Sequence, residues 1–246
     1  MNTLRTRLRE YKLSGMYANL DERLSYAKEK SLSNLEFLEL LVEDEANSRK
    51  DHSHTKRYAK AKLPVHKTVE DFIFNFQPSI DKKLFNDVFT CQFIKERQNV
   101  IFVGNPGTGK THLSIAIGIQ ALHKGFKVLF STVSEMLYNL NISKADNSYY
   151  KRLDYYLAPN LLILDELGFK KLPNYSADDF FEVISRRYEK GSVIITTNKS
   201  FEQWGDIFTD NILASAILDR IVHHSTIFKI NGQSYRAKDL KKTDRN

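Results

Sequence analysis

The stretch GNPGTGKT, residues 104–111, decides the fold of this chain of 246 residues. It fits the pattern G-x-x-x-x-G-K-[ST] and lies between an apolar run, NVIFV at 99–103, and a helical pattern, THLSIAIGIQALHK at 111–124. A strand, a glycine-rich loop and a helix in this order form a P-loop, whose backbone N–H groups cradle phosphate oxygens. A glycine-rich turn can match the pattern by chance, but the flanking strand and helix favour a nucleoside triphosphate site with Mg²⁺.

Each position of this loop has an expected role. Lys110 is expected to reach the β and γ phosphates, and Thr111 to offer its hydroxyl to Mg²⁺. The glycines allow tight turns that expose the backbone N–H groups. The residues predicted to bind the nucleotide are Gly104, Asn105, Pro106, Gly107, Thr108, Gly109, Lys110, Thr111 and His112.

A second apolar run, LLILDE at 161–166, ends in two carboxylates. Asp165 is predicted to hold Mg²⁺ with Thr111, directly or through water. Glu166 beside it is placed to polarise an attacking water, which favours hydrolysis over storage of the nucleotide. The alternative is a pair of acidic residues that ends a strand for solubility.

A third run, SVIITTN at 192–198, ends in Asn198, at the sheet edge where α/β proteins bind ligands. Asn198 is predicted to act in catalysis by holding the water or the γ-phosphate. Thr196 and Thr197 are alternatives for this role, and Asn198 is otherwise an N-terminal cap for a helix near Glu202.

Near-continuous apolar strands alternating with helices indicate a mainly parallel sheet covered on both faces, an α/β fold of three layers. KVLFS at 127–131 and the helix SEMLYNL at 134–140 lie between the P-loop and the strand of Asp165. The two strands are therefore not consecutive, and we expect the additional strand found in one large division of P-loop ATPases. The helix DDFFEVISRRYEK at 178–190 precedes the last run.

The first part of the chain has a different pattern. Ser33 and Glu36 have the spacing of a capping box. Apolar residues at helical spacing flank it, which predicts a small all-α domain: Leu4, Leu8, Leu13, Met16, Leu20 and Leu24, then Leu35, Leu38, Leu41, Val42 and Ala46. Because Pro64 disfavours helix before it, we expect a helical domain with a basic linker at 1–66 and an ATPase domain at 67–246.

The formal charge of +7 favours polyanionic partners, and its location says more. Between Arg49 and Lys67 lie seven lysines and arginines against Asp51 alone. Lysine and arginine neutralise phosphates without base contacts, so this segment is the candidate DNA site; the alternative is a solvated linker. The candidate DNA-binding residues are Arg49, Lys50, Lys56, Arg57, Lys60 and Lys62.

The composition is that of an ordinary globular protein, with 41% hydrophobic and 27% charged residues. No apolar run approaches the roughly 20 residues of a membrane span, and the first residues, MNTLRTRLRE, have no apolar core of a signal peptide. We therefore expect a soluble cytoplasmic protein that is not membrane-bound. Cys91 is expected to be a buried structural thiol.

Several stretches resemble one family specifically: LSGM and LDERL in the first 24 residues, KTVEDFIFNFQPSID, LLILDELGF, ITTNKSFEQWGDIF and ILDRIVHH. With the P-loop, this ordered set resembles the IstB/DnaC-like branch of AAA+ ATPases, and most closely the IstB-like helper ATPases encoded beside the transposase in certain insertion sequences. The resemblance runs nearly end to end.

The resemblance implies an AAA+ ATPase that uses ATP and Mg²⁺, oligomerises on duplex DNA, deforms it and delivers it to a cognate transposase, with ATP hydrolysis as timer. It also implies ATP sites between the subunits of a homo-oligomer, in which Arg220 of ILDRI matches the finger position that contacts the neighbour's γ-phosphate. Arg220 is otherwise an exposed helix residue paired with the neighbours of Asp219. Arg236 is a candidate sensor 2 residue, and residues near Lys144, Lys170 and Lys171 are candidate pore contacts with DNA.

Other functions remain open at this stage. A replicative helicase loader of the DnaC type shares the same core and differs in its partner. A small-molecule kinase is disfavoured by Glu166 and Asn198, which suit water activation, and by the absence of an evident acceptor lid. A DNA-binding protein with a vestigial site would have no need for the intact Lys110, Asp165 and Glu166. Arg186 and Arg187 are expected on a solvated helix face or a subunit interface.

Overall fold

The structure is a computed structural model, and it describes residues 2–169, 172, 174–208 and 210–235. Its contacts divide the chain into two compact units, Met1–Lys56 and Arg57–Asn246. We call them the N-terminal unit and, after the function expected from the sequence, the ATPase unit. The division falls inside helix α3 (Asn34–Ala61) rather than after residue 66, because the end of this helix packs in the ATPase unit, where Ala61 is fully buried.

The N-terminal unit consists of α1 (Asn2–Glu10), α2 (Ser14–Lys30) and the first part of α3. Its small core contains the buried side chains of Leu8, Leu20 and Leu41. The expected capping box is confirmed, since the Glu36 N–H donates to Ser33 Oγ and the Ser33 N–H donates to Glu36 Oε2. The expected apolar stripe on α3 is wrong in part, because three of its members are more than half exposed: Leu35, Leu38 and Val42.

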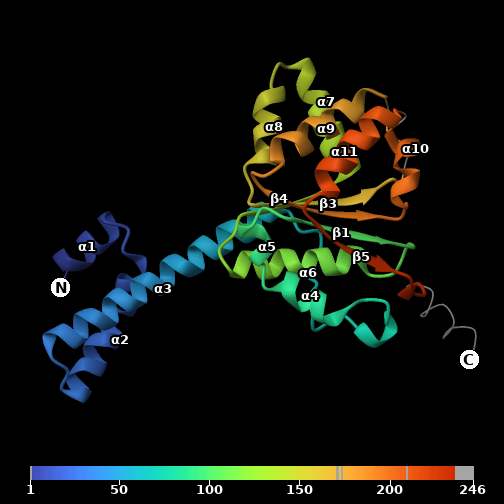
Figure 1. Ribbon diagram of the computed structural model, residues 1–246. Coiled ribbons are helices and arrows are strands. Elements are labelled where there is room, and N and C mark those ends of the chain that lie inside the picture. Colours follow the sequence, from blue (N-terminus) through green and yellow to red (C-terminus); the bar gives the residue numbers. More distant parts are fainter. Residues whose placement is uncertain (1, 170–171, 173, 209, 236–246) are drawn as a thin grey trace, which may run out of the picture. The chain divides into compact units, whose positions relative to one another are not determined.

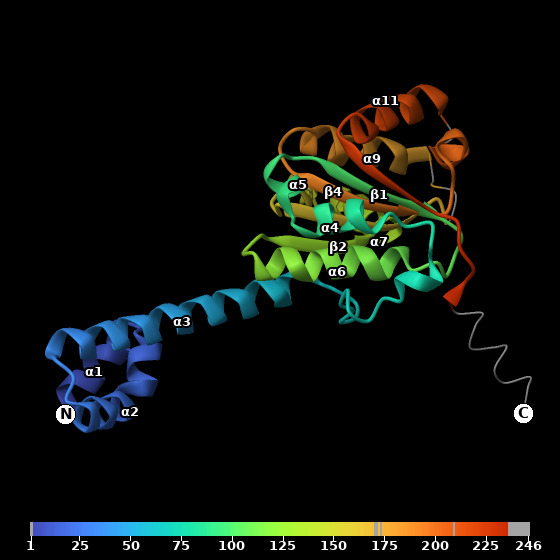
Figure 2. The same ribbon diagram turned by 60° about the horizontal axis from the view of Figure 1, so that its bottom comes forward.

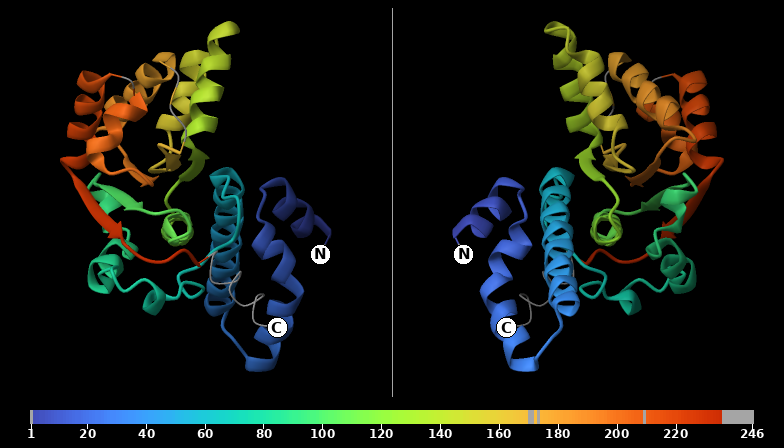
Figure 3. Two further views of the ribbon diagram at one scale, coloured as in Figure 1. Left: turned by 90° about the vertical axis from the view of Figure 1, so that its right-hand side faces the viewer. Right: turned by 90° about the vertical axis from the view of Figure 1, so that its left-hand side faces the viewer.

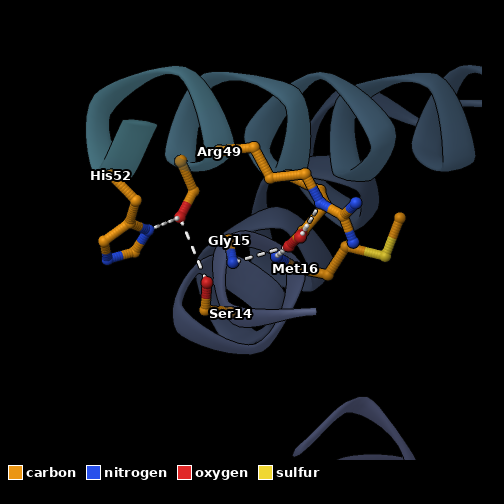
Figure 4. Close-up of polar contacts among 7 residues, drawn as sticks. Ser14, Gly15, Met16, Arg49 and His52 are labelled. Carbon is orange, nitrogen blue, oxygen red and sulfur yellow. Dashed lines mark hydrogen bonds and ion pairs between the residues drawn. The ribbon is translucent and has the colours of Figure 1, made fainter. Parts of the chain in front are cut away.

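One buried carboxylate, Glu45 on α3, ties the start of α2 to α3 (Figure 4). Its Oε2 accepts hydrogen bonds from the backbone N–H groups of Gly15 at 2.8 Å and Met16 at 3.3 Å. Its Oε1 accepts from Arg49 Nε at 2.7 Å. A Cβ at Gly15 would collide with the backbone of Asp44, so glycine allows the two helices to cross closely.

The ATPase unit is built on a parallel sheet with strand order β2-β3-β4-β1-β5 among the described residues. Strand β4 lies between β1 and β3, which confirms that the P-loop strand and the Asp165 strand are separated by an additional strand. The strands are β1 (Asn99–Gly104), β2 (Val128–Thr132), β3 (Leu161–Leu167), β4 (Ser192–Thr197) and β5 (Ser225–Ile230).

Helices cover both faces of this sheet (Figures 1 and 2). On one face, α4, α5 and α6 bury a core with the strand side chains of Val100, Phe102 and Ile163. On the other face, α7 to α11 bury a second core with Ile101, Leu162 and Ile195. Alternate residues of each strand thus enter opposite cores, and the three-layer α/β fold of the ATPase unit is confirmed (Figure 3).

The helices of the ATPase unit are α4 (Lys82–Phe89), α5 (Gln92–Lys95), α6 (Lys110–His123), α7 (Val133–Ala145), α8 (Tyr149–Leu157), α9 (Asn174–Arg187), α10 (Trp204–Phe208) and α11 (Asn211–Val222). Short 3-10 turns occur at Phe74–Phe76 and Phe201–Gln203. Cys91 is buried as predicted, and burial raises the pKa of its thiol to about 11.

Candidate functional site

The P-loop follows the carboxyl end of β1 and leads into α6. Gly107 and Gly109 have φ values of +80° and +95°, which favour glycine. A Cβ at Gly109 would also collide with the ring of Phe72. The loop therefore has the tight turns that direct backbone N–H groups and the positive end of α6 toward one point, which suits a phosphate.

Lys110 lies at the first position of α6, and its ammonium group turns back over the loop. Its Nζ donates to the carbonyl oxygens of Gly104 at 2.7 Å and Asn105 at 2.8 Å. The cation is thus held beside the N–H groups of the loop, where an anionic ligand would gain from both. This position agrees with the predicted contact to phosphate.

Thr111 and Asp165 come together from α6 and β3. Thr111 Oγ1 lies 2.9 Å from Asp165 Oδ1 and 3.0 Å from Oδ2, and the Asp165 side chain is buried. A hydroxyl and a carboxylate are oxygen ligands of the kind Mg²⁺ prefers, and Mg²⁺ commonly takes one or two protein ligands with substrate phosphates. No group of three His, Cys, Asp or Glu suited to a metal occurs among the residues the structure describes. The pair therefore fits a shared metal and phosphate site.

Glu166 is exposed next to the buried Asp165. It lies in an irregularity of the sheet, since the register between β3 and β4 shifts between Leu164 and Leu167. Its φ of +65° is in the left-handed region, which is uncommon for a residue other than glycine. Together with Lys110, Thr111 and Asn198, Glu166 lines one cleft at the carboxyl edge of the sheet.

Asn198 follows β4 and faces the same cleft. Its Oδ1 is buried, and no described residue gives it a hydrogen-bond partner. The capping alternative is wrong, because Ser200 caps the turn at Phe201–Gln203 in a capping box with Gln203. Buried polar atoms in proteins are rarely unpaired. A ligand or a water molecule bound in the cleft would therefore supply the missing hydrogen bond to Asn198 Oδ1.

A second hollow, of about 410 Å³, also borders the P-loop. Its walls combine Gly107–His112 with Phe72, Phe76 and Tyr235, three aromatic residues that the sequence analysis did not assign. The Tyr235 N–H donates to the Gly107 carbonyl oxygen at 2.9 Å, which joins the segment after β5 to the loop. Aromatic walls beside a phosphate loop suit a flat heterocycle. The run FIFNF at 72–76 is the signal that could have predicted Phe72 and Phe76.

His112 connects this hollow to the segment before it. One of its ring nitrogens, Nε2, is 2.7 Å from the Thr68 carbonyl oxygen, and its ring meets that of Phe72 edge to face. Thr68 in turn donates its N–H and its hydroxyl to Asp71, and these bonds lower the pKa of Asp71. His112 thus lines the hollow and also holds its wall in place, and its predicted contact with the nucleotide stays a prediction.

Arg220 lies far from the P-loop of its own chain. It is near the end of α11, which leads into β5, and β5 begins beside Asn99 at the amino end of β1. The P-loop follows the other end of β1, and six residues of strand span roughly 17 Å. Arg220 is half-buried, donates to the Ala216 carbonyl oxygen and stacks on Phe181. It is not the exposed, acid-paired residue of the alternative interpretation.

The predicted DNA-binding residues lie on α3 or directly after it, so the expected linker is helical as far as Ala61. Helical spacing places Arg49, Lys50, Lys56, Arg57 and Lys60 within about a third of the circumference. Arg49 also pairs with Glu45. Lys62 follows the helix and is exposed.

Among the candidate pore residues, Lys144 pairs with Asp179 at 2.8 Å. Three predicted residues lie outside the described part of the chain: Lys170, Lys171 and Arg236.

The prediction for Arg187 is wrong. Arg186 is partly exposed and pairs with Glu182, as expected for a solvated face. Arg187 is 2% exposed, and its guanidinium donates to backbone carbonyl oxygens of two other segments, 156–160 and the start of β4. These belong to Tyr156, Leu157, Pro159, Asn160 and Ser192. Burial lowers its pKa to about 10.

A family model described as IstB-like ATP binding protein matches residues 6–243. The chain belongs to this family. An ATP-binding protein of insertion sequence IS21 from Pseudomonas aeruginosa is 39% identical to this IstB-like protein over 98% of the chain and 91% of the relative. A second, of insertion sequence IS5376 from Geobacillus stearothermophilus, is 41% identical over 87% of the chain and 85% of the relative.

Solved structures agree with the fold of this IstB-like protein. The crystal structure of the DnaC helicase loader matches with a TM-score of 0.54 and 25% identity, over 71% of this chain and 99% of that one. The replication initiator DnaA, bound to AMPPCP and single-stranded DNA, matches with a TM-score of 0.59 and 20% identity, over 75% of this chain and 57% of that one. The ATPase unit therefore has the AAA+ fold. No described helix is long and apolar enough to cross a bilayer.

Proposed function

We propose that this protein is the ATP-hydrolysing helper of an insertion-sequence transposase. In this proposal it assembles on duplex DNA with ATP, deforms the DNA and delivers it to the transposase, and hydrolysis sets the lifetime of the complex. The observation that carries the proposal is the single cleft that brings Lys110, Thr111, Glu166 and Asn198 together, in a chain whose relatives are ATP-binding proteins of insertion sequences. Work on duplex DNA would place the protein in the cytoplasm.

The residues of the cleft divide into binding and catalytic roles. The loop N–H groups and Lys110 bind the phosphates, while Thr111 and Asp165 would hold Mg²⁺, which would neutralise charge on the phosphates. Glu166 is the general base for a water molecule, because its carboxylate is exposed beside the metal aspartate. The unpaired Oδ1 of Asn198 would accept a hydrogen bond from that water.

Arg220 would act on the site of a neighbouring subunit. The separation of Arg220 from its own P-loop by the length of β1 supports this role, since the finger must come from another copy. We expect Arg220→Ala and Glu166→Gln each to lose most ATPase activity while their P-loops stay intact. When the two variants are mixed, one kind of interface combines an intact Glu166 with an intact Arg220, so part of the activity should return. Two inactive proteins that remain inactive in a mixture, while still assembling together, would contradict a shared site.

The basic face of α3 supports DNA binding. Each phosphate contact that is lost should reduce the slope of log affinity against log salt by about 0.9. We therefore expect alanine at Lys56, Arg57, Lys60 and Lys62 to weaken binding to duplex DNA and to flatten its salt dependence. A control with the same loss of charge replaces four exposed lysines elsewhere, Lys28, Lys30, Lys82 and Lys83. Equal effects of the two sets would mean that the helix face has no special role.

Assembly is the direct test of the whole proposal. Electron microscopy of the protein with duplex DNA should show large complexes with ATP and fewer or none with ADP. Lys110→Ala should abolish these complexes, because it removes the phosphate contact. A protein that binds DNA as a monomer regardless of nucleotide would overturn the proposal. Phosphate release without an added acceptor would exclude the kinase alternative.

A helicase loader is the second candidate, favoured by the likeness to the DnaC structure. The two functions share the ATPase unit and differ in the protein they deliver. Retention of the transposase encoded beside this gene, and not of the replicative helicase, by the ATP-bound protein would support the transposition helper. The opposite retention would support the loader.

A further inference from the structure

The irregularity at the end of β3 has one residue opposite it. Leu164 pairs with Ile195 and Leu167 pairs with Thr197, so Asp165 and Glu166 together face the single residue Thr196. Two residues against one is the arrangement of a β-bulge, which bends a strand and re-aims its side chains. In a regular strand, Asp165 and Glu166 would point to opposite faces of the sheet. The bulge is therefore what allows both carboxylates to serve one site.

A bulge leaves a backbone N–H group without its partner in the sheet. Here that group belongs to Glu166, and Thr196 Oγ1 accepts its hydrogen bond at 3.0 Å. The same hydroxyl donates to Asp165 Oδ1 in a short hydrogen bond. A hydroxyl has one proton, so donation to the carboxylate leaves a lone pair directed at the Glu166 N–H. Thr196 is 1% exposed, and water does not compete for either bond.

The backbone of Glu166 is also costly to hold. Its φ of +65° is uncommon for a glutamate and persists only where surrounding contacts fix it. The bond from its N–H to Thr196 is the contact that joins this peptide to β4. Thr197, the next residue, uses its hydroxyl differently and accepts from the Lys199 N–H at 3.1 Å.

We propose that Thr196 is a positioning residue for hydrolysis, whose hydroxyl fixes the bulge peptide and so holds the Glu166 carboxylate against the attacking water. The inference rests on the proposed function, because it assigns Thr196 a role only if Glu166 is the general base. Thr196 lines the same cleft as Glu166, but its hydroxyl is engaged by the Glu166 N–H and by Asp165 Oδ1.

The test compares Thr196→Val, which removes the hydroxyl at nearly constant volume, with Thr196→Ser, which keeps it. In Thr196→Val the Glu166 N–H loses its acceptor. If the whole free energy of that lost hydrogen bond is lost from the transition state, the rate falls roughly tenfold to hundredfold. We expect Thr196→Val to lower kcat for phosphate release by that factor, with the affinity for ATP within about twofold of wild type because the P-loop is unchanged. Thr196→Ser should keep kcat within about threefold.

A double-mutant cycle separates positioning from general damage. If Thr196 acts through Glu166, then Glu166→Gln with Thr196→Val should be no slower than Glu166→Gln alone. Ser192→Ala is the matched control, since Ser192 lies at the opposite end of β4, is fully buried and donates to the Phe93 carbonyl oxygen at 3.2 Å. It should lower stability and leave kcat unchanged. If Thr196→Val does not fold, Thr196→Ala replaces it in the same cycle.

The possible failures are distinguishable. A wild-type protein that releases no phosphate with ATP and duplex DNA would overturn the proposed function, and this inference with it. A wild-type protein that is active, with Thr196→Val equally active, would overturn this inference alone. Additive losses in the double mutant would also overturn it, because Thr196 would then act independently of Glu166.

Discussion

Arg187→Met should destabilise the ATPase unit strongly, although residue 187 touches neither the P-loop nor the predicted DNA-binding residues. The guanidinium donates six hydrogen bonds to carbonyl oxygens at the end of α8, in the turn that follows and at the start of β4. Methionine fills a similar volume but donates none of them. Three buried carbonyl groups, those of Tyr156, Pro159 and Ser192, would then lose a donor, whereas the exposed Asn160 keeps a hydrogen bond from the Ser192 N–H at 3.0 Å.

The size of the effect follows from two opposing contributions. Three unpaired buried carbonyl groups cost about 2 kcal/mol each. Against this, burial lowers the pKa of Arg187 to about 10, and removal of the charge recovers a desolvation cost of roughly 3 kcal/mol. The remaining loss is about 3 kcal/mol, which for a unit of this size lowers Tm by roughly 9 °C.

Trp204, the only tryptophan of the sequence, makes the measurement specific to the ATPase unit. It is fully buried in the same core as the helices that Arg187 joins, so its fluorescence follows the unfolding of that unit. Arg186→Met is the matched control, because Arg186 is the preceding residue and forms one partly exposed pair with Glu182. Such a pair contributes at most about 1 kcal/mol. Equal Tm values for the two variants would refute the assignment of Arg187 as a buried support.

Three further predictions concern other parts of the chain. Gly109→Ala should prevent nucleotide binding, measured by titration with a fluorescent ATP analogue, because φ is +95° and the new Cβ meets the ring of Phe72; tight binding would contradict the loop geometry. Cys91, with a pKa raised to about 11, should react with a thiol reagent at pH 8 only after unfolding, since about a thousandth of it is thiolate. Hydrogen bonds from Arg23 lower the pKa of Asp44. The pair therefore stabilises the N-terminal unit fully above the ordinary pKa near 4, and this stabilisation is lost as the pH falls through the lowered pKa. In acid titrations followed by circular dichroism, the stability of Asp44→Asn should depend less on pH than that of the wild type.

The sequence was sufficient where function depends on neighbours along the chain. The P-loop, the end of LLILDE and the end of SVIITTN are local patterns, and parallel strands bring their carboxyl ends to one edge without further information. The structure places Lys110, Thr111, Glu166 and Asn198 in one cleft for this reason. That these residues meet could be predicted, because every strand of a parallel sheet ends at the same edge.

The sequence was insufficient where segments far apart supply the partners. Arg187 looks like any arginine at the end of a helix, and only the three-dimensional fold shows carbonyl oxygens from two other segments around it. The aromatic hollow combines Phe72 with Tyr235 across most of the chain length. Strand β5, with partly buried residues at one edge of the sheet, also has too weak a pattern to have been predicted.

The bulge shows a different limit. Side chains of a regular strand alternate in direction, so regular geometry along LLILDE would point Asp165 and Glu166 to opposite faces of the sheet. The register shift instead exposes Glu166 beside the buried Asp165. The signal for the bulge is in another strand, at Thr196. A hydroxyl inside an apolar strand is easily taken for ordinary β-propensity.

The positions of the P-loop and Arg220 at opposite ends of β1 limit the symmetry of any assembly that completes the site. An interface with a two-fold axis can pair each P-loop with the partner's Arg220 only if both lie in one surface patch that contacts its own copy. If the two lie on different surfaces, as their separation by the length of β1 favours, the site needs a heterologous interface, in which each subunit presents two different surfaces. Such an interface repeats with every added subunit and yields either a closed ring or an open helix, and each terminal subunit of an open helix has one unused surface. DNA length or a capping partner can then set the number of active sites, because a helix of n subunits contains one fewer complete site than it has subunits.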